Sequence, residues 1–283
     1  MIEIIRSPRE MQRRVRDARS GGDSVGFVPT MGAFHEGHLS LMRRAFMEND
    51  LVVASLFVNP KQFGEAADLA GYPRDEATDA RLAEEAGVDV LYAPHAGAMY
   101  PEGFATTITV GGVSEVLEGA MRGPGHFQGV ATVVAKLLNA VPCDRVYLGQ
   151  KDAQQVAVLR RMIRDLDFDV EVVVCPTVRE ADGLAMSSRN VRLGSEDRVR
   201  ALALRHGLDA ALAAIGSGAQ KGDVVIDAAK RTMRQDGVEP EYFALVDALS
   251  LEPVQSLRGD ILIAVAARVG PVRLIDNELI QIS

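Results

Sequence analysis

Residues 24–59 read SVGFVPTMGAFHEGHLSLMRRAFMENDLVVASLFVN, and this stretch decides the fold class. The run SVGFVPT (24–30) is typical of a strand that ends in a Pro-Thr turn, and HLSLMRRAFMEND (38–50) has a helical pattern. LVVASLFVN (51–59) is almost continuously apolar, as expected for a strand that is buried on both faces. A strand–helix–strand order predicts a right-handed βαβ unit, and therefore a mostly parallel sheet.

The same alternation continues over the first two thirds of the chain. Helical patterns cover 75–87, 130–140 and 152–166, and β-type runs cover 88–94, 144–149 and 170–178. Gly87 would close the first of these helices, because glycine is the usual residue at a helix stop. We therefore expect an α/β fold with an N-terminal Rossmann-like, doubly wound parallel sheet.

The pattern changes after Val178. Helices are expected at about 196–215 and 223–236, followed by β-type runs at 241–248, 260–270 and 272–278. Helices followed by consecutive strands predict a smaller C-terminal α+β unit. We place the domain boundary so that the domains are 1–177 and 178–283.

Composition narrows the class of protein. The 283-residue chain has a formal net charge of −8, which argues against a nucleic-acid binder. Its two cysteines, Cys143 and Cys175, are far apart and form no CxxC, which favours reduced, buried thiols over a disulfide or a metal site. No apolar run approaches the ~20 residues that cross a bilayer, and the charged N-terminus is no signal peptide. We expect a soluble, cytoplasmic protein.

The histidines of HEGH lie where a strand end and a short turn lead into a helix. A zinc-protease helix needs HExxH, whereas His35 and His38 are three residues apart with no obvious third ligand. Ligands of a doubly wound fold bind outside the carboxyl ends of the strands, where a helix N-terminus offers N–H groups to a phosphate. Imidazoles beside it can donate to phosphate oxygens. The position favours a phosphate site over a metal site or two capping residues.

Two further stretches place positive charge at similar points. In LGQKDAQQ a strand ends at Gly149, and Lys151 and Asp152 open a helix. A lysine at a helix N-terminus is unfavourable for the helix dipole, so a bound anion would explain it, although a solvated surface lysine is the alternative. In AMSSRN (185–190), two hydroxyls and an arginine precede a helix and suit a polyphosphate. This motif alone is weak, because Ser-Ser-Arg occurs in many loops.

Uncharged amides form the last group. Asn59 and Gln62 come just beyond the second predicted strand, and Gln155 lies one turn into the helix of Lys151. Amides at strand ends can bind the hydroxyls and carboxylate of a small substrate. The glycines and proline of RGPGHFQG predict a tight loop that presents His126 and Phe127 ahead of a helix.

Together these motifs resemble one family, the pantothenate synthetases (pantoate–β-alanine ligases). The motifs that occur in its order and spacing are PTMGAFHEGHLSL, FVNPKQFG, YPRD, GPGHFQGV, GQKDAQQ, PTVREADGLAMSSRN and RLIDN. The resemblance covers essentially the whole chain. HEGH corresponds to the HIGH-type signature of the wider nucleotidylyl-transferase superfamily, and MSSRN takes the place of the KMSKS-type loop. Phe34, Lys61 and Gln150 depart from the residues usual in the family.

The resemblance implies a two-step reaction. Pantoate would attack the α-phosphate of ATP-Mg²⁺ to give a bound pantoyl adenylate and pyrophosphate, and β-alanine would then displace AMP to give pantothenate. It also implies a homodimer formed through the N-terminal domain, with the C-terminal domain acting as a lid over ATP. Nucleic acid and membrane are not expected as partners.

The resemblance also implies roles for individual residues. His38, His35 and Lys151 would be catalytic. The ATP-binding residues would be Met31, His35, Gly37, His38, Gly149, Lys151, Asp152, Val178, Met186, Ser187, Ser188 and Arg189. The pantoate-binding residues would be Pro29, Met31, Asn59, Gln62 and Gln155. Asp79 would contact Mg²⁺ directly or through water, whereas His126 is either a site residue or a structural one.

Three other functions are weaker alternatives. A plain nucleotidylyl transferase would share HEGH but would not need the pair Gln62 and Gln155. A nucleotide sensor with a degenerate site is less consistent with the complete set of His, Lys, Ser and Arg groups. A metal hydrolase rests on two histidines alone.

Overall fold

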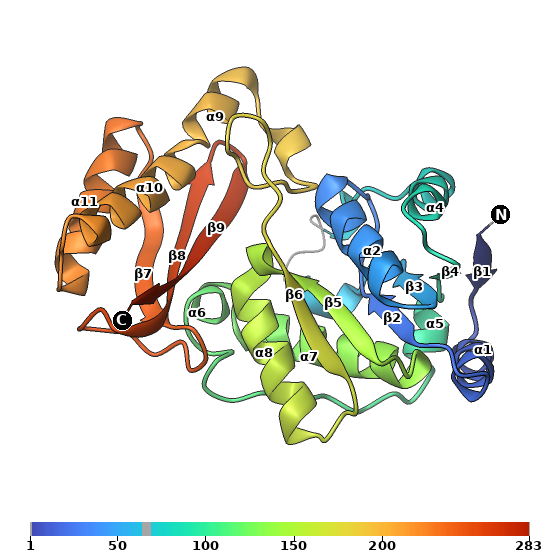
Figure 1. Ribbon diagram of the computed structural model, residues 1–283. Helices are drawn as coiled ribbons and strands as arrows, with labels where there is room; N and C mark the ends of the chain where they lie inside the picture. The colour runs from blue at the N-terminus through green and yellow to red at the C-terminus, as the bar shows by residue number, and fades with distance from the viewer. Residues whose placement is uncertain (1, 64–68, 283) are drawn as a thin grey trace. The chain divides into compact units, whose positions relative to one another are not determined.

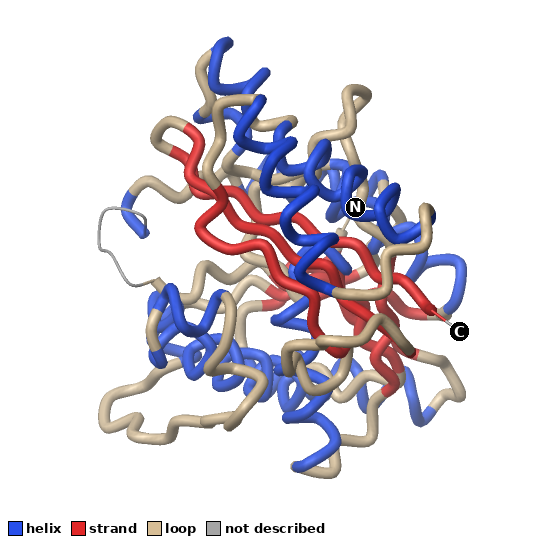
Figure 2. Tube along the Cα trace, turned by 90° about the vertical axis from the view of Figure 1, so that its left-hand side faces the viewer, coloured by secondary structure: helices blue, strands red, loops and turns tan. Residues whose placement is uncertain are grey.

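The computed structural model describes residues 2–63 and 69–282 (Figure 1). The chain divides into two compact units. Unit 1 consists of Met1–Gly149 and Val158–Pro176, and unit 2 consists of Gln150–Ala157 and Thr177–Ser283. The strands, red in Figure 2, form a six-stranded sheet and a separate three-stranded sheet.

Unit 1 is built on the six-stranded sheet, in the order β1-β4-β3-β2-β5-β6. Its strands are β1 (Glu3–Ile5), β2 (Val25–Val28), β3 (Leu51–Ser55), β4 (Val90–Tyr92), β5 (Arg145–Gly149) and β6 (Glu171–Cys175). Every neighbouring pair is parallel. The predicted α/β fold with a doubly wound parallel sheet is therefore confirmed.

Helices connect the strands of unit 1 and cover both faces of the sheet. The main ones are α1 (Pro8–Ser20), α2 (Glu36–Glu48), α4 (Glu76–Glu85), α7 (Pro124–Ala140) and the part of α8 (Ala153–Asp165) from Val158 onward, with the short η1 (Pro60–Gln62), α5 (Ala96–Met99) and α6 (Glu118–Arg122) between them. Right-handed crossovers place α2 and α4 on one face and α1 and α7 on the other. Met42 of α2 and Ala83 of α4 pack with Val52 and Leu91 of the sheet.

The winding direction reverses at β2. From β2 the chain continues through β3 and β4 on one side of the sheet, and then through β5 and β6 on the other side of β2. This point is the topological switch of the sheet, where an α/β fold binds its ligands outside the carboxyl ends of the strands. The residues that follow Val28 leave the sheet at this edge.

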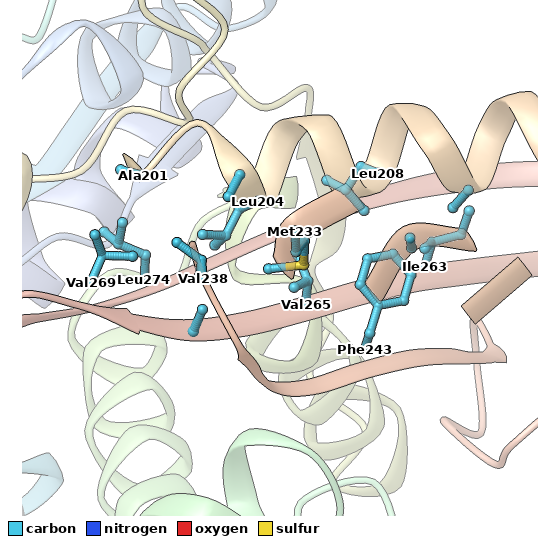
Figure 3. Packing of buried hydrophobic residues seen from close by; sticks show 14 of the residues in the cluster. Ala201, Leu204, Leu208, Met233, Val238, Phe243, Ile263, Val265, Val269 and Leu274 are labelled. Atoms are coloured by element: carbon cyan, nitrogen blue, oxygen red, sulfur yellow. The ribbon is translucent and has the colours of Figure 1, made fainter. Parts of the chain in front are cut away.

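Unit 2 packs helices on an antiparallel sheet in the order β7-β8-β9. Its elements are η2 (Gln150–Asp152), η3 (Asn190–Arg192), α9 (Ser195–Arg200), α10 (Ala203–Gly216), α11 (Gly222–Gln235), β7 (Pro240–Asp247), β8 (Gly259–Val269) and β9 (Val272–Ile282). In Figure 3, Leu204 and Leu208 of α10 point toward the sheet, in one cluster with Met233, Val265 and Ile263. A Cβ on Gly207 would lie 2.7 Å from the Met233 side chain, so a larger residue there would have to displace Met233 from its position against α10.

Several predicted boundaries are wrong. The strands predicted at 24–30 and 51–59 end earlier, at Val28 and Ser55, because the following residues make turns. The helix predicted at 196–215 is divided into α9 and α10. The helix predicted from residue 130 begins at Pro124, since the fixed φ of proline suits the first helical position.

The helix stop at Gly87 is confirmed. This residue has φ +88° and donates its N–H to the Glu84 carbonyl, while Val88 donates to the Ala83 carbonyl. The pair of bonds satisfies carbonyls that the end of α4 leaves without helical partners. In the described part of the chain, no helix has the length and apolar character needed to cross a membrane.

Candidate active site

The PTMG turn after β2 is tied to the end of β3. Thr30 donates its N–H to the Ser55 hydroxyl (3.0 Å) and its own hydroxyl to the Ser55 carbonyl. Gly32 donates its N–H to the Thr30 hydroxyl at 3.3 Å. Thr30 and Ser55 are both buried, so these bonds are protected from water. The turn therefore leaves the switch point along a defined path.

The next residues adopt a backbone conformation that side chains rarely take. Gly32 has φ +93°, and a Cβ there would lie 2.4 Å from Leu56 and 2.9 Å from an oxygen of Asp79. Ala33 has φ +53°, which is uncommon for any residue other than glycine. Such strained conformations persist only where the surroundings hold them, and they are frequent at functional sites.

Asp79 of α4 holds this strained segment. Its carboxylate accepts hydrogen bonds from the N–H groups of Ala33 (2.9 Å) and Phe34 (2.7 Å), one at each oxygen. The residue is only 3% exposed, so the bonds lie in a medium of low polarity. Burial raises the pKa of the Asp79 carboxyl, and the two backbone donors oppose that rise. Asp79 thus clamps the chain immediately before His35.

His35 is the N-cap of α2. Its Nδ1 accepts a hydrogen bond from the Gly37 N–H at 3.1 Å, and its backbone is extended, with φ −139° and ψ 174°. A neutral imidazole that accepts through Nδ1 carries its proton on Nε2, which is then a hydrogen-bond donor. The capping and phosphate-binding interpretations of His35 are therefore compatible, because Nδ1 accepts the capping hydrogen bond and the Nε2–H would be the donor to a phosphate.

His38 stands one turn into α2 beside His35. The two ring centroids are 4.2 Å apart, and the buried Phe34 ring lies 5.7 Å from that of His38. Both histidines are half-buried. In the described part of the chain, no group of three or more His, Cys, Asp or Glu residues is arranged to hold a metal ion. The structure thus places both imidazole rings side by side at the N-terminal end of α2.

The amides predicted for the substrate lie in and beside η1. Asn59 caps η1 by accepting from the Lys61 N–H (3.3 Å), and its amide nitrogen donates to Gln62 (3.0 Å). The Gln62 amide in turn donates to the Met31 sulfur at 3.1 Å. Asn59, Gln62 and Met31, all predicted pantoate residues, are therefore brought together within unit 1.

The predicted loop at RGPGHFQG is wrong, because His126 and Phe127 lie inside α7. The His126 Nδ1 is 2.9 Å from the Gln62 carbonyl oxygen, so this histidine helps to hold η1. A Cβ on Gly129 would lie 2.3 Å from the Lys61 carbonyl oxygen. Glycine at this position lets η1 approach the helix backbone closely.

A cavity of about 450 Å³ lies within unit 1 at the ends of β3 and β4. Its lining includes Met31, Phe57, Asp79 and His95. Pockets for small ligands typically have volumes of roughly 300–1,000 Å³. The cavity therefore places room for a small molecule beside the clamped turn.

Lys151 lies in η2, within unit 2. Asn277 of β9 donates its amide N–H groups to the carbonyls of Gln150 (3.0 Å) and Lys151 (2.9 Å), and its oxygen accepts from the Gln150 side chain. Asn277 is buried, and its neighbour Asp276 accepts two hydrogen bonds from Arg179 (2.6 and 3.1 Å). The backbone that carries Lys151 is thus fastened to β9.

The MSSRN segment of unit 2 folds into a tight turn. The Ser187 hydroxyl accepts from the Arg189 N–H (3.3 Å), and the Ser187 carbonyl accepts from the Asn190 N–H (3.0 Å). Asn190 also donates to Glu180, and Met186 donates its N–H to the Val178 carbonyl. These bonds hold the two serines and Arg189 on one short turn that leads into η3.

The structure therefore gathers the predicted residues into two groups. Unit 1 holds Pro29, Met31, His35, Gly37, His38, Asn59, Gln62 and Asp79, together with Gly149 at the end of β5. Unit 2 holds Lys151, Asp152, Gln155, Val178, Met186, Ser187, Ser188 and Arg189.

A family model described as "Pantoate-beta-alanine ligase" matches residues 3–279. The chain belongs to the pantoate-beta-alanine ligase family. The pantothenate synthetase of Moorella thermoacetica is 47% identical to this family member over 287 residues, and the match covers 100% of both chains. The match covers the full length of both proteins, so this chain is a ligase of that family.

Solved structures of the ligase family agree with this fold. The pantothenate synthetase of Thermus thermophilus has a TM-score of 0.92 and 46% identity, covering 98% of this chain and 99% of that one. A pantoate-beta-alanine ligase from Francisella tularensis has a TM-score of 0.78 and 33% identity, covering 99% of this chain and 98% of that one. The Francisella structure is a complex with beta-gamma ATP and beta-alanine.

The sequence did not identify several residues that support this ligase site. Asp276 and Asn277 lie in RLIDN, a motif that marked the family but suggested no role, and Tyr100 donates to Asn59 at 2.7 Å. Two adjacent polar residues in an otherwise apolar β-type run were a usable signal, since such residues need hydrogen-bond partners when they are buried. Tyr100 offered no comparable signal.

Proposed function

We propose that this ligase condenses pantoate with β-alanine in two steps, at the expense of ATP. In the first step a carboxylate oxygen of pantoate bonds to the α-phosphorus of ATP, and the bond to the bridging oxygen breaks to release pyrophosphate. In the second step the amine of β-alanine attacks the acyl carbon of the pantoyl adenylate, loses a proton and displaces AMP. Family membership supports the overall condensation, and the beta-alanine and beta-gamma ATP of the Francisella complex fit it.

The observation that carries the proposal is the hydrogen bond from Gly37 to His35 at the start of α2. Because Nδ1 accepts this bond, the neutral imidazole carries its proton on Nε2, which is therefore the donor nitrogen of the ring. Negative charge builds on the phosphate oxygens as pyrophosphate leaves, and preorganised donors stabilise that charge. We assign His35 and His38 to this role, and we assign Gly37 to the close approach of the nucleotide.

We assign the other residues by the same chemistry. Lys151, Ser187, Ser188 and Arg189 would bind phosphate oxygens, with Asp152 on the ribose. The backbones of Gly149, Val178 and Met186 would contact the nucleotide. Pantoate would be held by Pro29, Met31, Asn59, Gln62 and Gln155. The domains 1–177 and 178–283 would then act as a substrate-binding domain and a lid over ATP.

Magnesium enters this scheme as part of the ATP-Mg²⁺ substrate. Mg²⁺ keeps several water ligands in octahedral geometry. Asp79 is 3% exposed and uses each oxygen to accept a backbone N–H, which does not fit direct ligation. A contact of Asp79 with the hydrated ion stays a prediction.

We also propose a homodimer in the cytoplasm. Phe46 and Met47, near the end of α2 in unit 1, are 58% and 76% exposed, which supports an interface on this unit. Both cysteines are buried free thiols, which is consistent with a reducing compartment. Analytical ultracentrifugation of the wild type and of Met47→Asp tests the assembly.

The reaction is tested by the exchange of labelled pyrophosphate into ATP. Exchange should require pantoate and proceed without β-alanine, and adding β-alanine should give AMP and pantothenate. Oxygen-18 from the pantoate carboxylate should appear in AMP, because that oxygen forms the new bond to phosphorus. Exchange that does not depend on pantoate but requires another acceptor would instead indicate a plain nucleotidylyl transferase.

A further inference from the structure

The orientation of the Asn59 amide is determined by two backbone groups. The N–H of Lys61 can only donate, and it lies 3.3 Å from Oδ1. The carbonyl of Gly129 can only accept, and it lies 3.1 Å from Nδ2. Asn59 is 1% exposed, so protein groups are its partners. Its oxygen and nitrogen are therefore distinguished by chemistry, not by shape alone.

This orientation fixes the roles of two neighbours. The Tyr100 hydroxyl is 2.7 Å from Asn59 Oδ1, so it donates. Gln62 Oε1 is 3.0 Å from Asn59 Nδ2, so it accepts. The Gln62 amide must then present Nε2 at its other end, where it donates to the Met31 sulfur at 3.1 Å. All three bonds thus donate in one direction, from Tyr100 toward Met31.

The chain of bonds ends on a weak acceptor. A thioether sulfur accepts hydrogen bonds poorly, whereas a carboxylate or hydroxyl oxygen accepts them well. The Nε2 of Gln62 therefore gains more from a ligand oxygen than from Met31. Met31 and Gln62 are both among the residues to which the proposed function assigns pantoate.

Tyr100 is well placed to remain a donor. Its ring packs against Phe104 with centroids 5.1 Å apart, and the Lys61 ammonium lies 5.1 Å from the ring centroid. Burial raises the pKa of the Tyr100 phenol to about 12, so the hydroxyl keeps its proton throughout the neutral range.

We propose that Tyr100 is a positioning residue that acts through Asn59 to hold the Gln62 amide with its N–H groups toward pantoate. This inference rests on the proposed assignment of Gln62 to pantoate. The oriented amide makes the site selective for a substrate that presents acceptor oxygens. Without the Tyr100 donor, the Asn59 oxygen loses its shortest hydrogen bond and the Gln62 amide is less firmly held.

The test compares Tyr100→Phe with Tyr92→Phe. Each variant loses one phenol hydroxyl that donates a hydrogen bond inside unit 1, but that of Tyr92 donates to the Met99 sulfur and lies outside the chain of bonds. We expect Tyr100→Phe to raise the KM for pantoate about 10-fold, the loss expected for one hydrogen bond, with the KM for ATP unchanged. On a Gln62→Ala background the same substitution should have no further effect on the KM for pantoate. Tyr92→Phe should leave both constants unchanged.

Three outcomes would overturn the inference. They are an unchanged KM for pantoate in Tyr100→Phe, an equal rise in the KM for ATP, and an undiminished effect on the Gln62→Ala background. Side-chain amide NMR of the protein without substrates gives a readout that does not depend on the reaction. The Asn59 and Gln62 amide signals should shift in Tyr100→Phe and not in Tyr92→Phe. If these signals shift in Tyr100→Phe but the wild type shows no pantoate-dependent exchange, the proposed function is refuted and the hydrogen-bond chain stands.

Discussion

The carboxylate of Asp79 accepts the N–H of Phe34 at 2.7 Å, and so a residue of α4 holds the backbone that leads into His35. The two residues are 45 positions apart in the sequence. Asp79 also holds Ala33, whose positive φ is costly for a residue with a Cβ. The position of the imidazole therefore depends on a side chain that need not touch the nucleotide.

Replacing Asp79 with asparagine should reduce catalysis. Asparagine offers one acceptor atom, and its NH₂ group would face a backbone N–H. We expect the pantoate-dependent exchange rate to fall about 10²-fold, the usual consequence of a small misplacement of reacting groups. Asp89→Asn is the matched control, because the Asp89 carboxylate likewise accepts a backbone N–H, that of Val52 at 2.8 Å, and does not line the cavity. Equal exchange rates in the two variants would contradict the role of the clamp.

Substitutions at His35 can separate its cap from its catalytic role. Asparagine is a good N-cap but lacks a ring nitrogen that reaches a phosphate. We expect His35→Asn to keep the thermal midpoint of the wild type and to lose about 10²–10³-fold in adenylation rate. His35→Ala should lose the same activity and, in addition, about 1 kcal/mol of stability. A nearly normal rate in His35→Asn would leave His35 with a capping role alone.

Lys151→Ala should slow adenylation without unfolding the protein. The Lys151 ammonium is 3.7 Å from the Asp152 carboxylate, a pair that is too exposed to stabilise the fold by much. We expect a loss of about 10²-fold in the exchange rate, together with an unchanged melting temperature. Lys221→Ala removes another lysine of unit 2 and should retain full activity. Loss of activity in both variants would point to net charge instead of a specific phosphate contact.

Asn277→Ala should act on η2 through the backbone. The substitution removes the donors that serve the Gln150 and Lys151 carbonyls, so we expect a destabilisation of about 2–3 kcal/mol. Because the η2 backbone loosens, the KM for ATP should rise as well. Chemical denaturation and steady-state kinetics measure the two effects. A variant with lower stability and an unchanged KM for ATP would limit Asn277 to a structural role.

Stability should fall steeply at high pH. Burial raises the pKa of Tyr92, Tyr100 and Tyr147 each to about 12. Folding favours the protonated phenol, so the stabilisation is complete below the unfolded pKa of about 10 and is lost as the pH rises toward 12. Urea titrations at pH 8, 10 and 11 should show this loss. Tyr92→Phe should make it shallower, and an unchanged slope would contradict the assignment to this phenol.

Much of the fold could be predicted from local patterns. The run at 51–59 reads as a buried strand because a parallel strand covered on both faces has no polar side, and β3 occupies its first five residues. Gly87 could be predicted as a helix end because glycine readily adopts the positive φ that such an end requires, and the structure gives it φ +88°. The strand limits at Val28 and Ser55 could not be predicted, because the bonds that form the turn join Thr30 to a distant strand.

The candidate site likewise has features that local sequence predicts and features that depend on contacts between distant residues. The sequence alone determined the order of strands and helices, the family motifs, and the placement of His35 and His38 after a strand end, because these depend on neighbours along the chain. Only the tertiary structure decided that Asp79 holds the turn and that Tyr100 orients the Asn59 amide. Such bonds join residues far apart in sequence, and their geometry exists only once the sheet has brought those residues together.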